Sequence, residues 1–437
     1  MSITLTAPQF SYHDYYASEH ADSAEFLANL SLLISPLSGL YRDNFPLGVW
    51  FKMAQQFDAI VIGAGGVGSA AAYYLAKAGQ KVLLLEQFEL NHQNGSSYGH
   101  SRVIRYTYDN PIYVDLMRDA YPLWFALQDE AGEQLYVKTG GLDFGFPETD
   151  TFQRMQASLD ATALNYERLT QAEIAQRYPQ FALEDGMEGL FHADSGLLKT
   201  SRCVLAHTRL AQERGATVID QSPVLKIIPS ENGVEVQTEQ EMYGCDRLVI
   251  TVGSWAKGLL AEQGIDLPLK IMPCQLGFYQ PKNPASFEPS KFPVFFAHMN
   301  GDYGEMPYGI PHEDPSLGLK ITTFYGWDTV ETPSEIDYTP SQDWTERIRN
   351  WASQYIPDAA GPLISTRRCL YTLTPDKDFV VDQHPDYPHI AIGAGFSGHG
   401  FKFTTLMGKM LADLAVDGQT PHDTSLFKLA RFQLAAV

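Results

Sequence analysis

The chain has 437 residues and an ordinary globular composition, with 44% hydrophobic and 12% aromatic residues, which is enough for two domains with sizeable cores. The formal net charge of −21 argues against nucleic acid or an anionic membrane surface as a partner. Cys203, Cys245, Cys274 and Cys369 show neither metal-ligand spacing nor a disulfide framework, and no apolar run is long enough to span a bilayer. We therefore expect a reduced, cytoplasmic protein without a metal site.

The first 52 residues differ from the rest of the chain. They lack the basic start of a signal peptide and are too acidic for a transit peptide. After Met53 the sequence runs straight into a strand of the kind that opens a nucleotide-binding fold. We interpret residues 1–52 as an extension without a catalytic role.

A strand, a glycine turn and a helix follow in direct succession. The strand 57–62 is apolar and rich in β-branched residues, and the helix 70–78 is rich in alanine. Between them, Gly63 permits a tight turn, Gly65 lets a pyrophosphate approach the backbone, and Gly68 lets helix and strand pack closely. Because the helix N-terminus would face the phosphates, this arrangement predicts a dinucleotide site rather than an accidental glycine loop.

The next strand, 81–85, ends on Glu86, about 20 residues after the glycines. A carboxylate at this position accepts hydrogen bonds from ribose hydroxyls, so the pattern favours FAD or NAD over NADP. Later, the strand 246–252 enters a turn at Gly253, a second place where backbone can approach a dinucleotide. We expect Val224 to contact the adenine.

Two arginines three residues apart, Arg102 and Arg105, close the polar loop 91–105. At that spacing both would face one side of a helical turn. A solvated basic loop is the plain alternative. We prefer an anion-binding or cofactor-binding role, because the loop follows the ribose strand directly.

The C-terminal part repeats the strand–glycine–helix pattern. The strand 389–392 leads through Gly398 and Gly400 to Lys402, and a helix begins near Thr404. A lysine in a first helical turn opposes the helix dipole unless a ligand needs its charge. The turn itself is suited to stabilising negative charge on a cofactor.

Four separated motifs occur in a fixed order: the glycines at 63–68, the loop 95–105 with Ser101 and Arg102, Cys369-x-Tyr371-Thr372, and the segment 395–402. With them, and with the tail 426–432, the chain from about residue 54 onward resembles the monomeric sarcosine oxidase family. This family includes N-methyltryptophan oxidase and the peroxisomal sarcosine/pipecolate oxidases.

The resemblance implies an FAD cofactor that is attached through a cysteine thioether, and by position this cysteine is Cys369. Ser101 and Arg102 would bind the same cofactor, with Arg102 against the flavin. Arg367 and Arg368 could promote the thiolate of Cys369. A buried free thiol is the plain alternative for a single cysteine.

The resemblance also assigns the catalytic residues. Arg105 and Lys402 would hold a substrate carboxylate, and Lys320 would activate oxygen at the other flavin face. Tyr308 and Tyr371 match tyrosines near the substrate. Without the resemblance, Lys320 would be interpreted as a surface lysine.

Three features depart from the family pattern. Phe324 stands where a histidine is common, Tyr98 stands where another histidine is usual, and the segment 299–319 is reshaped. They concern the identity of the substrate rather than the type of reaction, and they favour a larger or more apolar side-chain pocket.

The predicted fold is α/β, an FAD-binding Rossmann-like domain of the glutathione-reductase type with a second, α+β substrate domain on an antiparallel sheet. The FAD-binding domain would consist of residues 53–140, 196–264 and 365–437. The substrate domain would consist of residues 141–195 and 265–364.

The predicted activity is oxidation by O2 of the C–N bond of a secondary-amine amino acid, sarcosine or another N-methyl amino acid. The products would be an imine, hydrolysed to aldehyde and amino acid, and hydrogen peroxide. The alternatives are an oxidase of cyclic amino acids such as L-pipecolate or proline, and a flavin dehydrogenase with another electron acceptor. We expect a monomer that acts on a small amino acid and O2, without nucleic acid or membrane partners.

Overall fold

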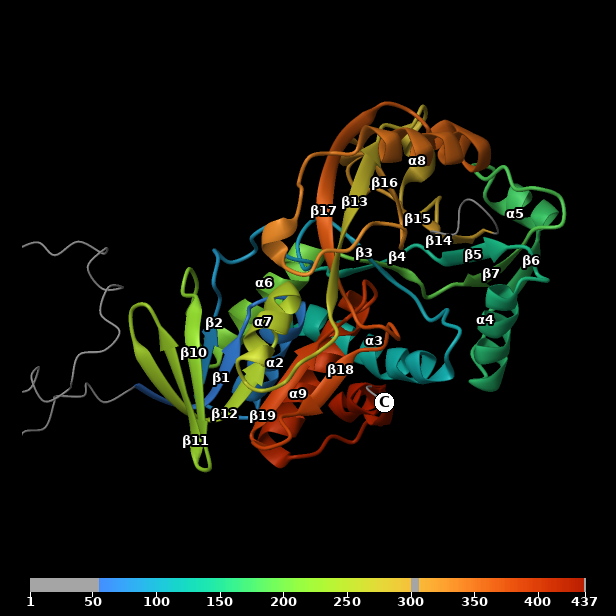
Figure 1. Ribbon diagram of the computed structural model, residues 1–437. Helices are drawn as coiled ribbons and strands as arrows, with labels where there is room; N and C mark the ends of the chain where they lie inside the picture. The colour runs from blue at the N-terminus through green and yellow to red at the C-terminus, as the bar shows by residue number, and fades with distance from the viewer. Residues whose placement is uncertain (1–54, 300–305, 436–437) are drawn as a thin grey trace, which may run out of the picture. The chain divides into compact units, whose positions relative to one another are not determined.

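The computed structural model describes residues 55–299 and 306–435. The expected extension 1–52 and part of the segment 299–319 lie outside the described residues. In the part of the chain that is described, the strands form two eight-stranded sheets and a three-stranded sheet (Figure 1).

The first sheet has a parallel centre. Its strands are β1 (Gln55–Ile62), β2 (Val82–Leu85), β9 (Thr217–Ile219), β10 (Val224–Ser230), β11 (Gly233–Thr238), β12 (Met242–Ile250), β18 (Val380–Gln383) and β19 (Ile390–Ala394). β9, β2, β1, β12 and β19 run parallel in that order. These strands confirm the four expected at 57–62, 81–85, 246–252 and 389–392.

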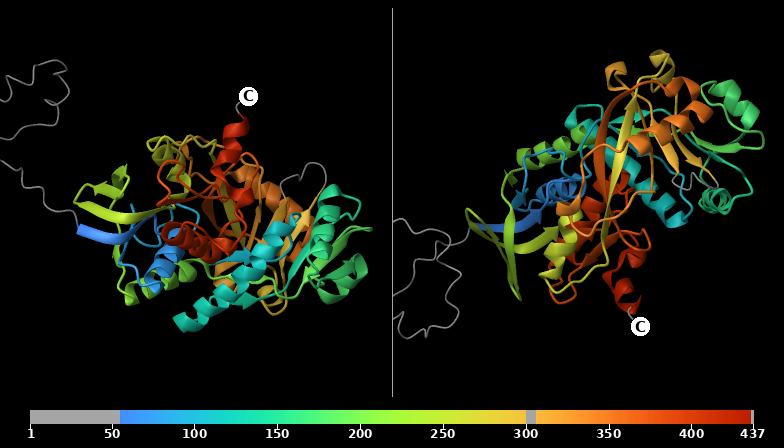
Figure 2. Two further views of the ribbon diagram at one scale, coloured as in Figure 1. Left: turned by 90° about the horizontal axis from the view of Figure 1, so that it is seen from below. Right: turned by 45° about the horizontal axis from the view of Figure 1, so that its top comes forward.

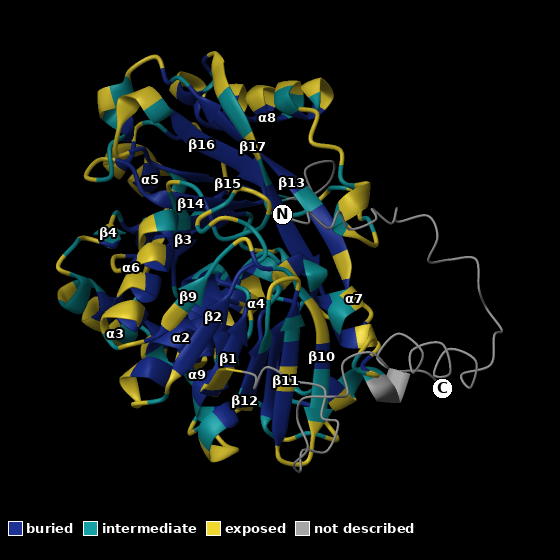
Figure 3. Cartoon of the chain, turned by 90° about the vertical axis from the view of Figure 1, so that its left-hand side faces the viewer, coloured by how far each residue is buried: buried dark blue, intermediate teal, exposed yellow. Residues whose placement is uncertain are grey.

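The first sheet divides into two branches at strand β12. One of its edges pairs with β1, and the other pairs first with β11 and then with β19. The antiparallel strands β10 and β11 therefore extend the sheet at one edge, where Figures 1 and 2 show them as a yellow-green ribbon. The strands β1, β2 and β12 are largely buried, as Figure 3 shows.

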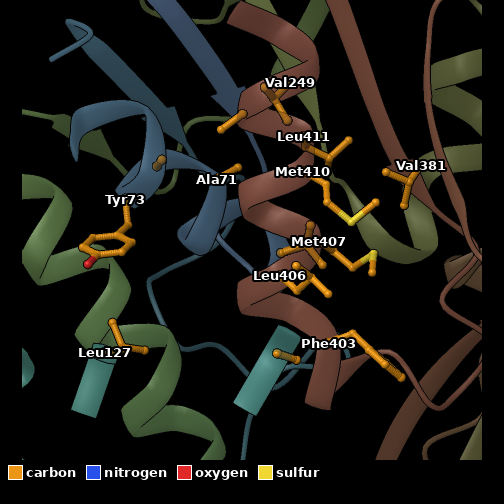
Figure 4. Close-up of a cluster of buried hydrophobic side chains, with 14 of the residues drawn as sticks. Ala71, Tyr73, Leu127, Val249, Val381, Phe403, Leu406, Met407, Met410 and Leu411 are labelled. Atoms are coloured by element: carbon orange, nitrogen blue, oxygen red, sulfur yellow. The ribbon is translucent and has the colours of Figure 1, made fainter. Parts of the chain in front are cut away.

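Two helices cover the parallel strands. α2 (Gly66–Lys77) and α9 (Thr404–Asp417) pack closely against each other and against β1, β2, β12 and β19. Figure 4 shows side chains of α9, among them Leu406, Met407 and Met410, in the same buried cluster as Ala71 of α2. Each of these large side chains stabilises the fold by about 1.5–3 kcal/mol through its burial. At Gly408 the helices touch, because a Cβ there would overlap with Ala70.

The expected helix at 113–127 is confirmed and is longer. α3 (Pro111–Ala131) begins after Asn110, whose side chain accepts a hydrogen bond from the Ile112 amide, and it ends at Gly132 in the left-handed conformation. The other α-helices of the described chain are α4 (Asp150–Ala161), α5 (Gln171–Arg177), α6 (Thr200–Glu213), α7 (Ala256–Ala261) and α8 (Gln342–Tyr355). No helix in the described ranges is long and apolar enough to cross a membrane.

The second sheet is mixed. Its strands, in spatial order, are β17 (Leu363–Leu373), β13 (Lys270–Tyr279), β16 (Leu319–Thr323), β15 (Pro307–Ile310), β14 (Val294–His298), β5 (Gly141–Gly145), β7 (Glu188–His192) and β6 (Glu167–Thr170). The prediction of an antiparallel sheet was wrong at one place, since β14 and β5 run parallel. Two distant chain segments meet there, so no hairpin turn fixes their direction.

Strands β13 and β17 form the longest ladder, and Figure 1 shows them running together from the second sheet toward the first. Their register places Cys274 opposite Cys369. The predicted domain boundary between residues 364 and 365 falls inside β17. The division into two domains stays a prediction, with the two large sheets as its structural counterparts.

The third sheet joins β3 (Arg102–Ile104), β8 (Gly196–Leu198) and β4 (Tyr136–Lys138). The helical turn expected around Arg102 and Arg105 was therefore wrong. In an extended backbone, side chains three residues apart point to opposite faces. The two guanidinium groups consequently reach different partners.

Candidate active site

A cavity of about 430 Å³ lies at the carboxyl ends of the parallel strands. This is the usual place for a ligand in an open α/β sheet, and the volume is typical of a small-molecule site. Nine of the predicted cofactor residues line it: Gly63, Gly65, Glu86, Arg102, Val224, Gly253, Cys369, Gly398 and Gly400.

The glycine turn fits a dinucleotide phosphate. Gly63 has a φ of +96°, and a Cβ there would lie 2.6 Å from the Thr251 carbonyl oxygen. A Cβ on Gly68 would overlap with the Gly63 carbonyl, so Gly68 serves the contact of helix and strand. A Cβ on Gly65 would meet nothing closer than the Ser97 hydroxyl at 3.6 Å and would occupy space beside the N-terminus of α2. That free space is where a phosphate can approach backbone N–H groups.

Glu86 is fixed at the edge of this cavity. Its Oε2 accepts a hydrogen bond from the Ala64 amide at 2.8 Å, and its Oε1 accepts one from the Phe88 amide at 3.0 Å. Each carboxylate oxygen has a second lone pair. The side chain is therefore oriented by backbone and can still accept hydrogen bonds from ribose hydroxyls.

Cys369 and Arg102 line the other end of the cavity. The Cys369 Sγ lies 3.4 Å from the Arg102 guanidinium, which also donates to the carbonyls of Ser96 at 2.9 Å and Ser101 at 3.0 Å. The cation beside this thiol is thus Arg102. Arg367 and Arg368, which we expected to play that part, donate to backbone carbonyls elsewhere.

Lys320 belongs to a second cavity of about 700 Å³, which Arg102 and Ser101 also line. The lysine is 2% exposed, and its Nζ donates to the Ser101 carbonyl at 3.3 Å and lies 5.6 Å from the centre of the Tyr308 ring. Burial, together with Arg102, holds the pKa of Lys320 well below its usual value. Ser101 contributes its carbonyl here and does not line the dinucleotide cavity.

Arg105 and Lys402 lie against the same ring, that of Tyr108. The guanidinium carbon is 5.3 Å and the Lys402 Nζ is 5.1 Å from its centre. The Lys402 Nζ donates to the Tyr108 hydroxyl at 2.8 Å and to the His399 carbonyl at 2.9 Å. Burial, and to a smaller extent the positive charge of Arg105, hold the pKa of Lys402 well below its usual value. Two buried cations against one ring are suited to a carboxylate.

Aromatic rings form the neighbouring wall. The hydroxyls of Tyr308 and Tyr371 are 3.4 Å apart, and burial raises the pKa of both tyrosines, so both stay protonated. The Phe324 ring lies 5.8 Å from that of Tyr371 and 6.3 Å from that of Tyr308, and Phe296 stacks on Tyr308 at 5.0 Å. His399 stays neutral as a structural partner, since burial and Lys402 lower its pKa to about 3.

The sequence analysis missed Asp143, His298 and Tyr108. Asp143 Oδ1 lies 2.8 Å from Arg105 Nη1 and 2.9 Å from His298 Nε2. A single carboxylate inside the apolar strand Gly141–Gly145 was the available signal, because a buried charge needs a partner. The partner itself could not be identified, since His298 follows 155 residues later.

A model of the family "FAD dependent oxidoreductase" matches residues 58–414. A monomeric sarcosine oxidase of Bacillus sp. (strain NS-129) is 35% identical over 385 residues, covering 87% of this chain and 98% of that protein. An N-methyl-L-tryptophan oxidase of Salmonella typhimurium (strain LT2) is 33% identical, with coverages of 86% and 99%.

Among solved structures, NikD, described as an unusual amino acid oxidase essential for nikkomycin biosynthesis, matches with a TM-score of 0.78 and 26% identity. The match covers 86% of this chain and 98% of NikD. It confirms the fold over most of the length of both chains. The chain belongs to the FAD-dependent oxidoreductase family, in the group of the monomeric sarcosine oxidases.

Proposed function

We propose that this chain oxidises the C–N bond of a secondary-amine amino acid, sarcosine or another N-methyl amino acid, with FAD as cofactor and O2 as electron acceptor. The observation that carries the proposal is that Arg105 and Lys402 are both buried against the Tyr108 ring, each two or three residues along the chain from a residue that lines the dinucleotide cavity, Arg102 or Gly400. The names of the relatives, sarcosine and N-methyl-L-tryptophan oxidases, support it.

The glycine turn, Glu86 and Gly253 would hold the dinucleotide part of FAD, and Cys369 would be the covalent attachment point. The thiol is buried, lines the cavity, and lies 3.4 Å from the Arg102 guanidinium. Bound FAD supplies the acceptor for the hydride taken from carbon next to the amine nitrogen. The protein binds and orients the substrate and the cofactor and polarises the reacting groups.

Arg105 and Lys402 would bind the substrate carboxylate and so fix the position of the amine. The positive field of these two residues, with Arg102, lowers the pKa of a substrate ammonium group. More of the substrate is then present as the neutral amine, which is the form that can release a hydride from the neighbouring carbon. Water hydrolyses the resulting imine to an aldehyde and an amine.

Lys320 would stabilise the negative charge that dioxygen acquires as it is reduced to hydrogen peroxide. It is a buried lysine in a cavity that shares Arg102 with the dinucleotide site, and no carboxylate of the described chain forms an ion pair with it. A preorganised cation in such a place favours a transition state that gains negative charge.

A second candidate substrate class is the cyclic amino acids, such as L-pipecolate or proline. It is favoured by the aromatic wall of Phe324, Tyr308 and Phe296, which suits an apolar ring better than a bare methyl group.

The names of the bacterial relatives support a monomer. A cytoplasmic location stays part of the proposal.

A panel of N-methyl and cyclic amino acids, read by peroxide formation, tests the proposal. We expect peroxide with at least one secondary amine and none with the matching primary amine. Anaerobic reduction by substrate followed by air distinguishes an oxidase from a dehydrogenase. If the reduced protein stays bleached in air, or if no secondary amine bleaches it, the proposal is wrong.

A further inference from the structure

Arg105 is fixed along one edge of its guanidinium. Nη1 donates to Asp143 Oδ1 at 2.8 Å and to the Thr107 carbonyl, and the guanidinium carbon lies 4.0 Å from the centre of the Phe296 ring. Nε, on the other edge, is buried and has no hydrogen-bond partner within the described residues. This buried donor is therefore available to a ligand.

Asp143 is itself held in place. It is 1% exposed in β5, and its Oδ1 also lies 2.9 Å from Nε2 of His298 in β14. Burial raises the pKa of Asp143, but Arg105 and His298 lower it by more, so the net direction is downward and the carboxylate is charged. Asp143 and His298 have no part in the reaction described above, although they contact Arg105 directly or through Asp143.

Lys402, like Arg105, has a donor left over for a ligand. It is 5% exposed, and its third N–H is left after the bonds to Tyr108 and His399. Within residues 55–299 and 306–435 no carboxylate forms an ion pair with it. Arg105 lowers the pKa of Lys402, whereas Asp143 raises it. Without Asp143 the two cations would disfavour each other's charge.

We propose that Asp143, held by His298, is a positioning residue for carboxylate recognition. It anchors Arg105 by one edge so that the Nε edge faces the ligand, and its negative charge offsets the positive charge of Arg105 beside Lys402. The inference rests on the proposed binding of a substrate carboxylate by these two cations.

The surroundings of Lys402 make this testable by pH. The ionisable groups around it are Arg105, Tyr108, Tyr113, Asp143, Tyr325 and His399. Burial raises the pKa of the three tyrosines, and burial with Lys402 lowers that of His399 to about 3. Below about pH 10, where an exposed lysine stays protonated, Lys402 is therefore the group in this set that is expected to lose its proton.

The experiment compares the binding of two probes to the flavin-containing protein. One is (methylthio)acetic acid, a thioether with a free carboxylate, and the other is the corresponding amide. Sulfur replaces the amine nitrogen, so neither probe is oxidised at the C–N position. Dissociation constants are read from the change in flavin absorbance across that pH range. In the wild type the affinity for the acid should fall as pH rises, while the affinity for the amide stays constant.

In Asp143→Asn the midpoint of that fall should move to lower pH by at least about one pH unit, because a nearby negative charge is lost. Asparagine keeps an acceptor for Arg105, so the protein should stay folded. Asp194→Asn removes an exposed carboxylate that pairs with Lys138 and should leave the curve unchanged. An unchanged midpoint in Asp143→Asn, or equal changes for acid and amide, would overturn the inference.

His298→Leu and His298→Gln give a second measurement at constant pH. Leucine removes the donor to Asp143, so the affinity for the acid probe should fall several-fold while the affinity for the amide stays unchanged. Glutamine offers an N–H to Asp143, so it should restore the affinity for the acid. Equal binding of acid by both variants would count against the inference. A wild type that binds acid and amide alike would instead refute the proposed carboxylate recognition itself.

Discussion

At the scale of single residues, the chemistry concentrates on a thiol and a lysine that both lie beside Arg102. Cys369→Ser should abolish covalent attachment of flavin, because a serine hydroxyl is a far weaker nucleophile than a cysteine sulfur. The measurement is flavin fluorescence of the acid-denatured protein. Cys274→Ser is the matched control, since Cys274 faces Cys369 across the ladder and does not line the dinucleotide cavity. Yellow colour that stays with the Cys369→Ser polypeptide would contradict the assignment.

Lys320→Met should slow reoxidation by O2 by about 10²- to 10³-fold, the usual effect of removing one charge-stabilising group. Anaerobic reduction by substrate should change little. Because burial and Arg102 lower the pKa of Lys320, its charge is lost as pH rises through a value below that of an exposed lysine. The O2 rate of the wild type should therefore decline with rising pH, and that of the variant should not.

Lys199→Met is the control for Lys320. This lysine lines the same cavity but pairs with Glu313 at 2.8 Å nearer the solvent. Stopped-flow absorbance separates the two half-reactions. An O2 rate that is equal in Lys320→Met and the wild type would exclude the role of Lys320.

At the scale of elements, the turn between β1 and α2 separates binding from stability. Gly65→Ala would place a methyl group in the open space where a phosphate is expected, so FAD should be lost while the fold stays stable. Gly68→Ala would overlap with the Gly63 carbonyl and should lower the free energy of unfolding by about 1–3 kcal/mol. Flavin content and thermal unfolding of the two variants check this. Normal flavin content in Gly65→Ala would refute the phosphate position.

The same elements show how far sequence patterns reach. The glycine turns and the strands beside them could be predicted, because turn chemistry and apolar runs are local signals. The course of the backbone at Arg102 and Arg105 could not. Residues 102–104 are extended because they pair with Leu198 and Gly196, almost 100 residues away. That pairing overrides the helical spacing.

At the scale of the molecule, the missed part of the site comes from tertiary pairing. Asp143 and His298 meet because β5 and β14 run parallel, with Asp143 opposite Phe296. No hairpin or local motif announces such a pairing. By contrast, Lys320 was predicted through the family resemblance alone, whereas Arg105 and Lys402 were already conspicuous in their own segments.

All residues that the proposed reaction uses lie within the part of the chain that the structure describes. Every predicted site residue lies between Gly63 and Lys402, and β1 begins at Gln55. The protein that starts at Met53 should therefore keep its flavin spectrum, its peroxide-forming activity and a thermal midpoint close to that of the full chain. A protein that starts at Gly63, without β1, is the contrast. The loss of β1 breaks the ladders to both β2 and β12, so that protein should not fold. A colourless, inactive product from Met53 would show that residues 1–52 take part in forming the site.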